Sequence, residues 1–247
     1  MTNLVNRKYF PTLEVQGRRV INTRETSTKG NALEDKNLTF RSYQKIKQMI
    51  FNYDIIPGQR LIFIDFAQRL NVSRTPVNNA LTILAKEGFL DFVPNQGFRV
   101  HQISREEADA LHEIREIIEL GAIGNAIENL TPEKLKTLER HRILYENSVI
   151  EQVNRGRFAL DEEFHATYVK ITGNEYLVGY FREVYERLFF RTRIEGLPAG
   201  RAQKVVLEHK QIFDAIASKD VKIAKRLIKF HIKAGKEYIG SSVFGGH

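Results

Sequence analysis

Three histidines and one aspartate in the second half of the chain have the spacing of a shared metal site. Asp161 and His165 are four residues apart, so a helix would project both side chains from one face. His209 and His231 each stand among apolar residues at helical spacing, which places them on buried helix faces. Buried imidazoles need partners, and one divalent ion would satisfy all three, although the spacing alone leaves hydrogen-bonded core histidines as an alternative. One carboxylate and three imidazoles suit zinc first, with nickel, manganese or iron as further choices.

A second group of polar residues, in the N-terminal half, has side chains that suit DNA. Arg74 lies in the first turn of an expected helix, and its planar guanidinium matches the O6 and N7 acceptors of guanine. Asn78 lies one turn later on the same outer face. A polar turn follows the helix, and its glycine lets the backbone approach a minor groove closely. The candidate DNA-binding residues are Ser73, Arg74, Thr75, Asn78, Gln96 and Gly97.

The elements around these residues are expected to form a winged helix-turn-helix. The predicted elements are helices near 43–51, 65–70 and 74–87 and a hairpin of residues 89–93 and 98–100. Ser73 is expected to cap the third helix with its hydroxyl group, and Gly88 is expected to end it. The hairpin after the third helix would act as a wing. A winged helix that contacts protein instead of DNA is the alternative.

The rest of the chain has helical periodicity and no strand alternation. The predicted helices lie at about 104–129, 132–153, 155–171, 174–193, 203–218 and 220–239, the first with a capping box that begins at Ser104. The fold class is therefore mainly α: an N-terminal winged helix-turn-helix with a small β-hairpin wing, and a C-terminal all-α helical bundle. The predicted parts are a flexible N-terminal extension (1–40), a DNA-binding domain (41–102), a helical effector-binding, metal-binding and dimerisation domain (103–240) and a tail (241–247).

The charge distribution and the composition of the chain limit the classes of protein to which it can belong. Residues 1–100 carry 15 Lys and Arg against 8 Asp and Glu, whereas residues 101–247 carry 23 against 22, so nearly all the basic excess lies in the first two-fifths of the chain, which suggests that this part contacts a polyanion. The chain has no cysteine, which excludes disulfides and thiolate metal sites. It shows no run of about 18 apolar residues and no signal peptide, so we expect a cytoplasmic protein without a membrane partner.

The N-terminal motifs resemble those of the GntR family of bacterial regulators. They are Pro57-Gly58-x-x-Leu61, the run from Leu70 to Val77, Leu81-x-x-Leu84, Glu87-Gly88 and the run from Pro94 to Val100. The resemblance implies that Ser73, Arg74, Thr75 and the wing residues Gln96 and Gly97 contact operator DNA. Asn78 departs from the family pattern, which usually has arginine there, and this puts one phosphate contact in doubt.

The C-terminal half is similar to the ligand-binding domain of the FadR subfamily. The shared motifs are Leu111-x-x-Ile114-Arg115-x-x-x-Glu119, Asp161-x-x-Phe164-His165, Gly173-Asn174-x-x-Leu177, Glu208-His209-x-x-Ile212-x-x-Ala215-Ile216 and His231. The resemblance implies a metal held by one Asp and three His, with a small organic acid beside it. It places Arg115 opposite the ligand carboxylate, with an ion pair to Glu119 as the alternative, and makes Arg193 a further effector-binding candidate.

These patterns predict a homodimeric transcription regulator, not an enzyme. It would bind double-stranded DNA at a pseudo-palindromic operator, under the control of a small carboxylate effector bound next to the metal. Two alternatives stay open at this point: a metal-dependent helical-bundle enzyme fused to a winged helix, and a regulator whose metal is purely structural.

Overall fold

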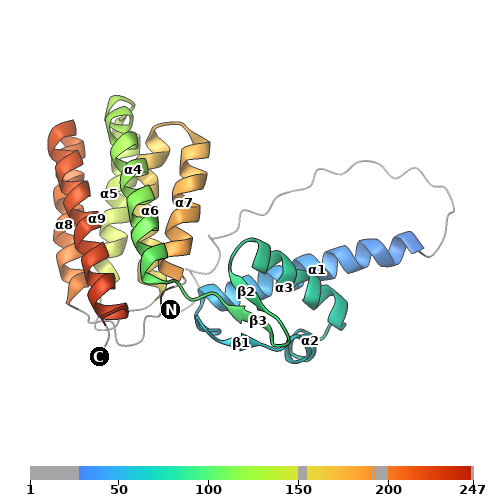
Figure 1. The fold of residues 1–247 in the computed structure, drawn as a ribbon. Helices are drawn as coiled ribbons and strands as arrows, with labels where there is room; N and C mark the ends of the chain where they lie inside the picture. The colour runs from blue at the N-terminus through green and yellow to red at the C-terminus, as the bar shows by residue number, and fades with distance from the viewer. Residues whose placement is uncertain (1–27, 150–154, 191, 193–199, 246–247) are drawn as a thin grey trace, which may run out of the picture.

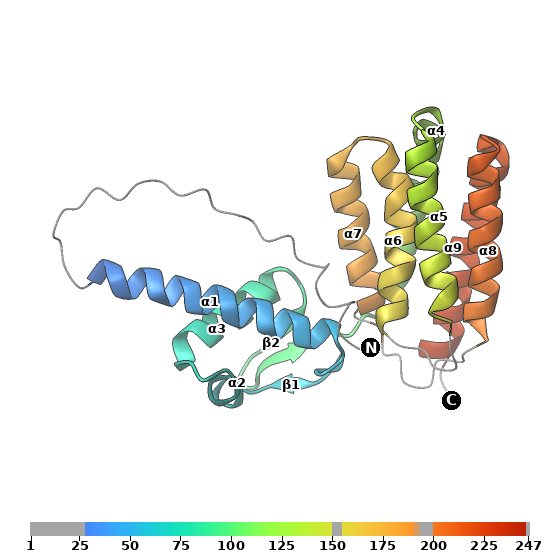
Figure 2. The ribbon, with the colours of Figure 1, turned by 180° about the vertical axis from the view of Figure 1, so that it is seen from behind.

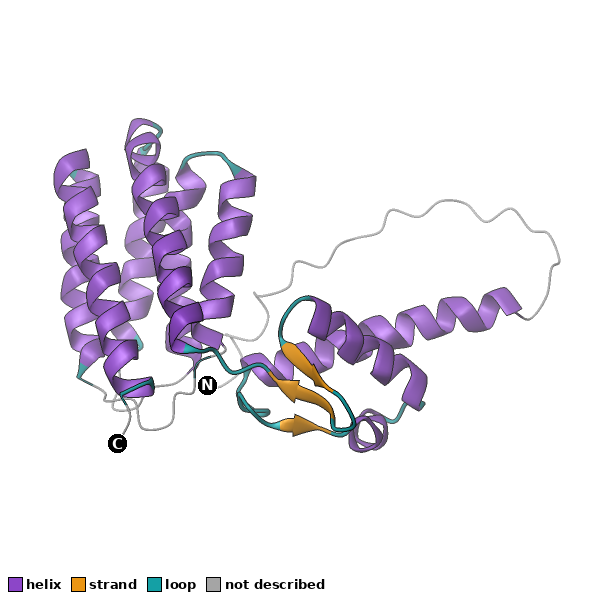
Figure 3. Ribbon diagram, viewed as in Figure 1, coloured by secondary structure: helices purple, strands orange, loops and turns teal. Residues whose placement is uncertain are grey.

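The chain forms two units, a small mixed unit and a helical bundle (Figure 1). The computed structural model describes residues 28–149, 155–190, 192 and 200–245. Buried apolar side chains form two separate clusters, one in each unit. The strands lie only in the N-terminal unit, as Figure 3 shows for the described residues. The predicted mainly α fold class is therefore confirmed. Among the described residues, no helix is long and apolar enough to cross a membrane.

The N-terminal unit is a winged helix-turn-helix built on three helices and three strands. These are α1 (Thr28–Phe51), β1 (Arg60–Leu61), α2 (Phe63–Leu70), α3 (Arg74–Lys86), β2 (Leu90–Val93) and β3 (Gly97–Val100). The strands form an antiparallel sheet in the order β1-β3-β2, with Phe92 opposite Phe98. Helix α3 packs on α1 through its fully buried face, which includes Val77, Leu81 and Leu84. That packing leaves the opposite face of α3 to solvent.

Three details of this unit differ from the sequence expectations. Helix α1 begins at Thr28, so residues 28–40 are helical although their polar composition gave no apolar period; residues 1–27 lie outside the described part. Strand β1 was not expected, because two residues are too short to show alternation. Ser73 is the N-cap of α3, but its side chain makes no capping hydrogen bond.

The C-terminal unit is a bundle of long helices. The described helices are α4 (Arg105–Glu128), α5 (Pro132–Asn147), α6 (Arg155–Ile171), α7 (Glu175–Phe190), α8 (Arg201–Ala217) and α9 (Val221–Val243). Helix α4 packs against α6, α7 and α9, and α5 packs against α6 and α8 (Figure 2). Each predicted helix is present, but α5 ends at Asn147 instead of near residue 153, and α9 continues beyond residue 240 into the segment expected to be a tail. The predicted helix ends at residues 150–153 and 193 lie outside the described residues.

Side-chain caps fix where the bundle helices begin. The hydroxyl of Ser104 accepts a hydrogen bond from the Glu107 amide at 3.1 Å, as the capping-box pattern predicts. The carboxylate of Asp220 accepts from the Ile223 amide at 2.9 Å at the start of α9. Such caps satisfy amides that have no partner within the helix, so they define the residue at which each helix begins.

Candidate functional site

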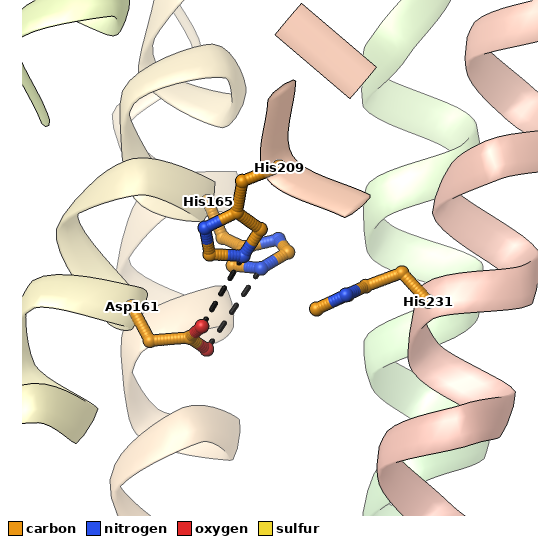
Figure 4. A group of neighbouring side chains, drawn as sticks. All are labelled: Asp161, His165, His209 and His231. Atoms are coloured by element: carbon orange, nitrogen blue, oxygen red, sulfur yellow. Dashed lines mark ion pairs between the residues drawn. The ribbon is translucent and has the colours of Figure 1, made fainter. Parts of the chain in front are cut away.

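Three helices of the bundle bring the four predicted metal ligands together (Figure 4). Helix α6 supplies Asp161 and His165, α8 supplies His209, and α9 supplies His231. One potential ligand atom from each side chain lies within 4.8 Å of all the others. All four residues are buried, and the rings of His165 and His209 have no exposed surface.

Several nitrogen atoms in this cluster have no hydrogen-bond partner. They are Nε2 of His165 and both ring nitrogens of His209. The nearest carboxylate oxygens belong to Asp161, at 3.2 Å from His209 Nε2 and 3.8 Å from His165 Nε2. Unsatisfied buried polar atoms are costly, and one divalent cation would satisfy Nε2 of His165 together with Nε2 of His209, since a metal ion binds one nitrogen of each ring. The donor set therefore fits a metal ion such as zinc.

The electrostatics of the cluster also suit a cation. Burial alone would raise the pKa of Asp161, but the approach of His209 Nε2 to 3.2 Å, together with His165 and His231, holds that pKa well below its usual value. Burial lowers the pKa of His209 to about 3 and also lowers that of His231. At neutral pH the aspartate is then ionised and these two imidazoles are neutral, which is the protonation state that binds metal ions.

Two glutamates contact the cluster histidines through the Nδ1 atoms of their rings. The sequence did not predict either glutamate as a site residue. His165 Nδ1 lies 2.9 Å from an oxygen of Glu119, and His231 Nδ1 lies 2.7 Å from an oxygen of Glu208. Glu119 was foreseen only as the ion-pair partner of Arg115. Glu208 precedes His209 in the chain, but it contacts a histidine on a different helix. No local spacing predicts either contact.

A cavity of about 70 Å³ opens beside the cluster. Asp161 and His231 line it together with three arginines, Arg115, Arg157 and Arg201. Arg115 is ion-paired with Glu119 and Arg201 with Glu208, so it is the guanidinium donors of the lining, more than a net charge, that favour an anionic occupant.

Arg115 combines the two roles that the sequence left open. Its Nε donates to Glu119 at 2.6 Å, so the ion pair exists, while its buried Nη2 has no hydrogen-bond partner. Arg157 and Arg201, which also line the cavity, were not anticipated, because neither follows the spacing of the other site residues. Arg193, the other predicted effector-binding residue, lies outside the described residues.

The predicted DNA-binding residues lie at the start of α3 and in the wing. Ser73, Arg74, Thr75 and Asn78 are exposed, and so is Gln96 at the turn between β2 and β3. Gly97 has φ +85°, a backbone conformation that residues other than glycine rarely adopt. The Nε of Arg60 in β1 donates to the Gln96 carbonyl at 2.8 Å and so fixes the turn. Arg60 was not predicted as a site residue, because a strand of two residues leaves no alternation in the sequence.

Comparisons with known proteins agree with this architecture. The chain is 26% identical over 198 residues to the uncharacterized HTH-type transcriptional regulator YdhC of Bacillus subtilis (strain 168), covering 80% of this chain and 88% of that protein. It is 32% identical over 148 residues to the Nta operon transcriptional regulator of Aminobacter aminovorans, covering 60% and 70% of the two chains. The fold is similar to that of E. coli McbR/YncC, with a TM-score of 0.69, 20% identity, and coverage of 82% of this chain and 96% of that one.

Two family matches cover the two units. Residues 39–100 match the bacterial regulatory proteins of the gntR family, and residues 110–234, about half of the chain, match the FCD domain. The relatives and the matching families are transcriptional regulators, not enzymes. The chain belongs to the GntR family of bacterial transcriptional regulators and carries an FCD ligand-binding domain.

Proposed function

We propose that this regulator binds its operator under the control of a small organic acid held next to a divalent metal ion. The main support for this proposal is a buried cluster with unsatisfied nitrogen atoms and a cavity lined by arginines beside it. The cluster consists of Asp161, His165, His209 and His231. The four residues would hold the metal, zinc being the first choice. A bound metal would supply a positive centre for acid oxygens.

The cavity residues would bind and orient the acid. The free Nη2 of Arg115 can donate to a carboxylate while its Nε keeps Glu119 in place. The cavity of about 70 Å³ suits a small acid. Arg193 remains a proposed effector contact.

Operator binding would use the exposed start of α3 and the wing. The proposed contacts are Ser73, Arg74, Thr75, Asn78, Gln96 and Gly97. We propose a homodimer, whose two heads would contact a pseudo-palindromic operator in the bacterial cytoplasm. Binding of the acid would change the position of the two DNA-binding units relative to each other. The coupling free energy between two such binding sites is typically about 1–3 kcal/mol.

The first test is elemental analysis of the purified protein, expressed as metal atoms per chain, with a His209→Ala variant as control. We expect one divalent ion in the parent protein and loss of the ion in the variant. Small carboxylic acids are then screened for their effect on operator binding. No metal in the parent protein after incubation with zinc, nickel or manganese would refute the metal site and reduce the histidines to core residues.

A purely structural metal is the second candidate, because the cluster is buried in the bundle core. It predicts that Asp161→Ala lowers the melting temperature while no small acid changes the affinity for the operator. An acid that changes operator affinity in the parent protein but not in Arg115→Ala would exclude this candidate.

A further inference from the structure

Two chains of contacts with the same order run from the cavity to the histidine cluster. In the first, Arg115 donates to one oxygen of Glu119 at 2.6 Å, and the other oxygen lies 2.9 Å from His165 Nδ1. The hydroxyl of Tyr168 also donates to that second oxygen. This chain joins α4 to α6.

The second chain joins α8 to α9. Arg201 reaches both oxygens of Glu208, at 2.5 and 2.7 Å, and one of these oxygens lies 2.7 Å from His231 Nδ1. In both series of contacts, an arginine that lines the cavity orients a carboxylate. The carboxylate in turn faces Nδ1 of a cluster histidine, which is the ring nitrogen that points away from the cluster.

The chemistry of imidazole gives this arrangement a consequence. A neutral imidazole carries one hydrogen, and a carboxylate that accepts from Nδ1 keeps the hydrogen there. The lone pair is then on Nε2, the ligand atom available to the cluster. Carboxylates behind metal-binding histidines fix the tautomer and the ring orientation, and losing one typically weakens metal affinity about 10–100-fold.

We propose that Glu119 and Glu208 are positioning residues that hold His165 and His231 in the tautomer that binds metal. Arg115 and Arg201 orient these two carboxylates from the cavity side. This inference rests on the metal site proposed above and adds two residues to it. It also explains why charged glutamates are tolerated beside the bundle core, since both oxygens of each carboxylate are used.

Glu208 is the better residue to test, because Glu119 is fully buried and its loss could unfold the bundle. The full chain is compared with Glu208→Leu, which removes the acceptor, and with Glu208→Gln, which keeps an oxygen acceptor without the charge. The matched control is Glu163→Gln, which removes a carboxylate paired to Arg182 at 2.9 Å and contacts none of the histidines in the cluster.

The first measurement is the tautomer of His231 in the metal-free protein, from long-range 1H–15N NMR spectra. We expect the Nδ1–H form in the parent protein, in Glu208→Gln and in Glu163→Gln, and a mixture of both tautomers in Glu208→Leu. A dominant Nδ1–H form in folded Glu208→Leu would overturn the proposal without involving the metal.

The second measurement is zinc affinity, from competition with a chelator. We expect about 10–100-fold weaker binding in Glu208→Leu, an intermediate loss in Glu208→Gln and no change in Glu163→Gln. Unchanged affinity in Glu208→Leu, with zinc bound by the parent protein, would overturn the positioning role alone. A parent protein that binds no zinc or other divalent ion would overturn both this inference and the metal site. If Glu208→Leu does not fold, Glu208→Ala, which also removes the acceptor, replaces it in both measurements, and a dominant Nδ1–H form or unchanged zinc affinity in that variant overturns the proposal.

Discussion

At the scale of single residues, Arg74 carries the clearest prediction for DNA. It is exposed in the first turn of α3, where its guanidinium can pair with guanine. Arg74→Ala should weaken specific binding by about 1–3 kcal/mol and relax specificity at one base pair. Fluorescence anisotropy with operator and scrambled duplexes measures this. Arg226→Ala, which removes an exposed arginine of α9, is the charge-matched control; equal losses in both variants would contradict a specific role.

His112 predicts how stability depends on pH. Burial lowers its pKa to about 4, whereas an unfolded chain has the ordinary value of 6.5. Between these values the unfolded state binds more protons than the folded state. The contribution of His112 to the free energy of unfolding is therefore fully present above pH 6.5 and is lost as the pH is lowered toward 4. This histidine accounts for up to about 3 kcal/mol of the loss.

The variant His112→Asn cannot titrate in this range and keeps a donor for the Ala108 carbonyl, which the imidazole contacts at 2.8 Å. Urea unfolding of the metal-free protein at pH 7 and pH 5 should show a smaller difference in the variant than in the parent. An identical difference in the two proteins would show that His112 does not take part.

At the scale of elements, two serines at helix N-termini should behave differently. Ser104 caps α4 through its hydroxyl, whereas Ser73 makes no such bond at the start of α3. Ser104→Ala should therefore lower the free energy of unfolding by about 1 kcal/mol, and Ser73→Ala should lower it much less. Ser73→Ala should instead weaken operator binding. Chemical unfolding and DNA titration of both variants test the pair; a large stability loss in Ser73→Ala would show that its hydroxyl caps α3 in solution.

At the scale of the whole molecule, His101 ties the two units together. Its Nδ1 lies 2.8 Å from Asp91 in β2, and its Nε2 lies 2.7 Å from Glu107 in α4. His101→Ala should free the wing from the first turn of α4 without unfolding either core. We expect faster proteolytic cleavage between residues 100 and 105 and an unchanged melting temperature. Gln102→Ala, a neighbouring exposed residue, is the control, and equal cleavage rates in all three proteins would argue against the link.

The sequence by itself determined most of the fold. Pro76 in the first turn of α3, Gly88 after it and the β-rich runs around residues 94–97 are local signals, and local signals set element boundaries. The metal candidates were also readable, because Asp161 and His165 share one helix face and the apolar neighbours of His209 and His231 mark buried faces.

Only the tertiary structure decided which side chains meet between helices. Glu119 and His165 are 46 residues apart in the chain, and Glu208 and His231 are 23 apart, yet each pair is in contact. Arg115 and Arg201 come from different helices and line one cavity. Periodicity tells which face of a helix is buried, but the crossing angle and the vertical offset of packed helices decide the partners, and these depend on how all the core side chains fit together.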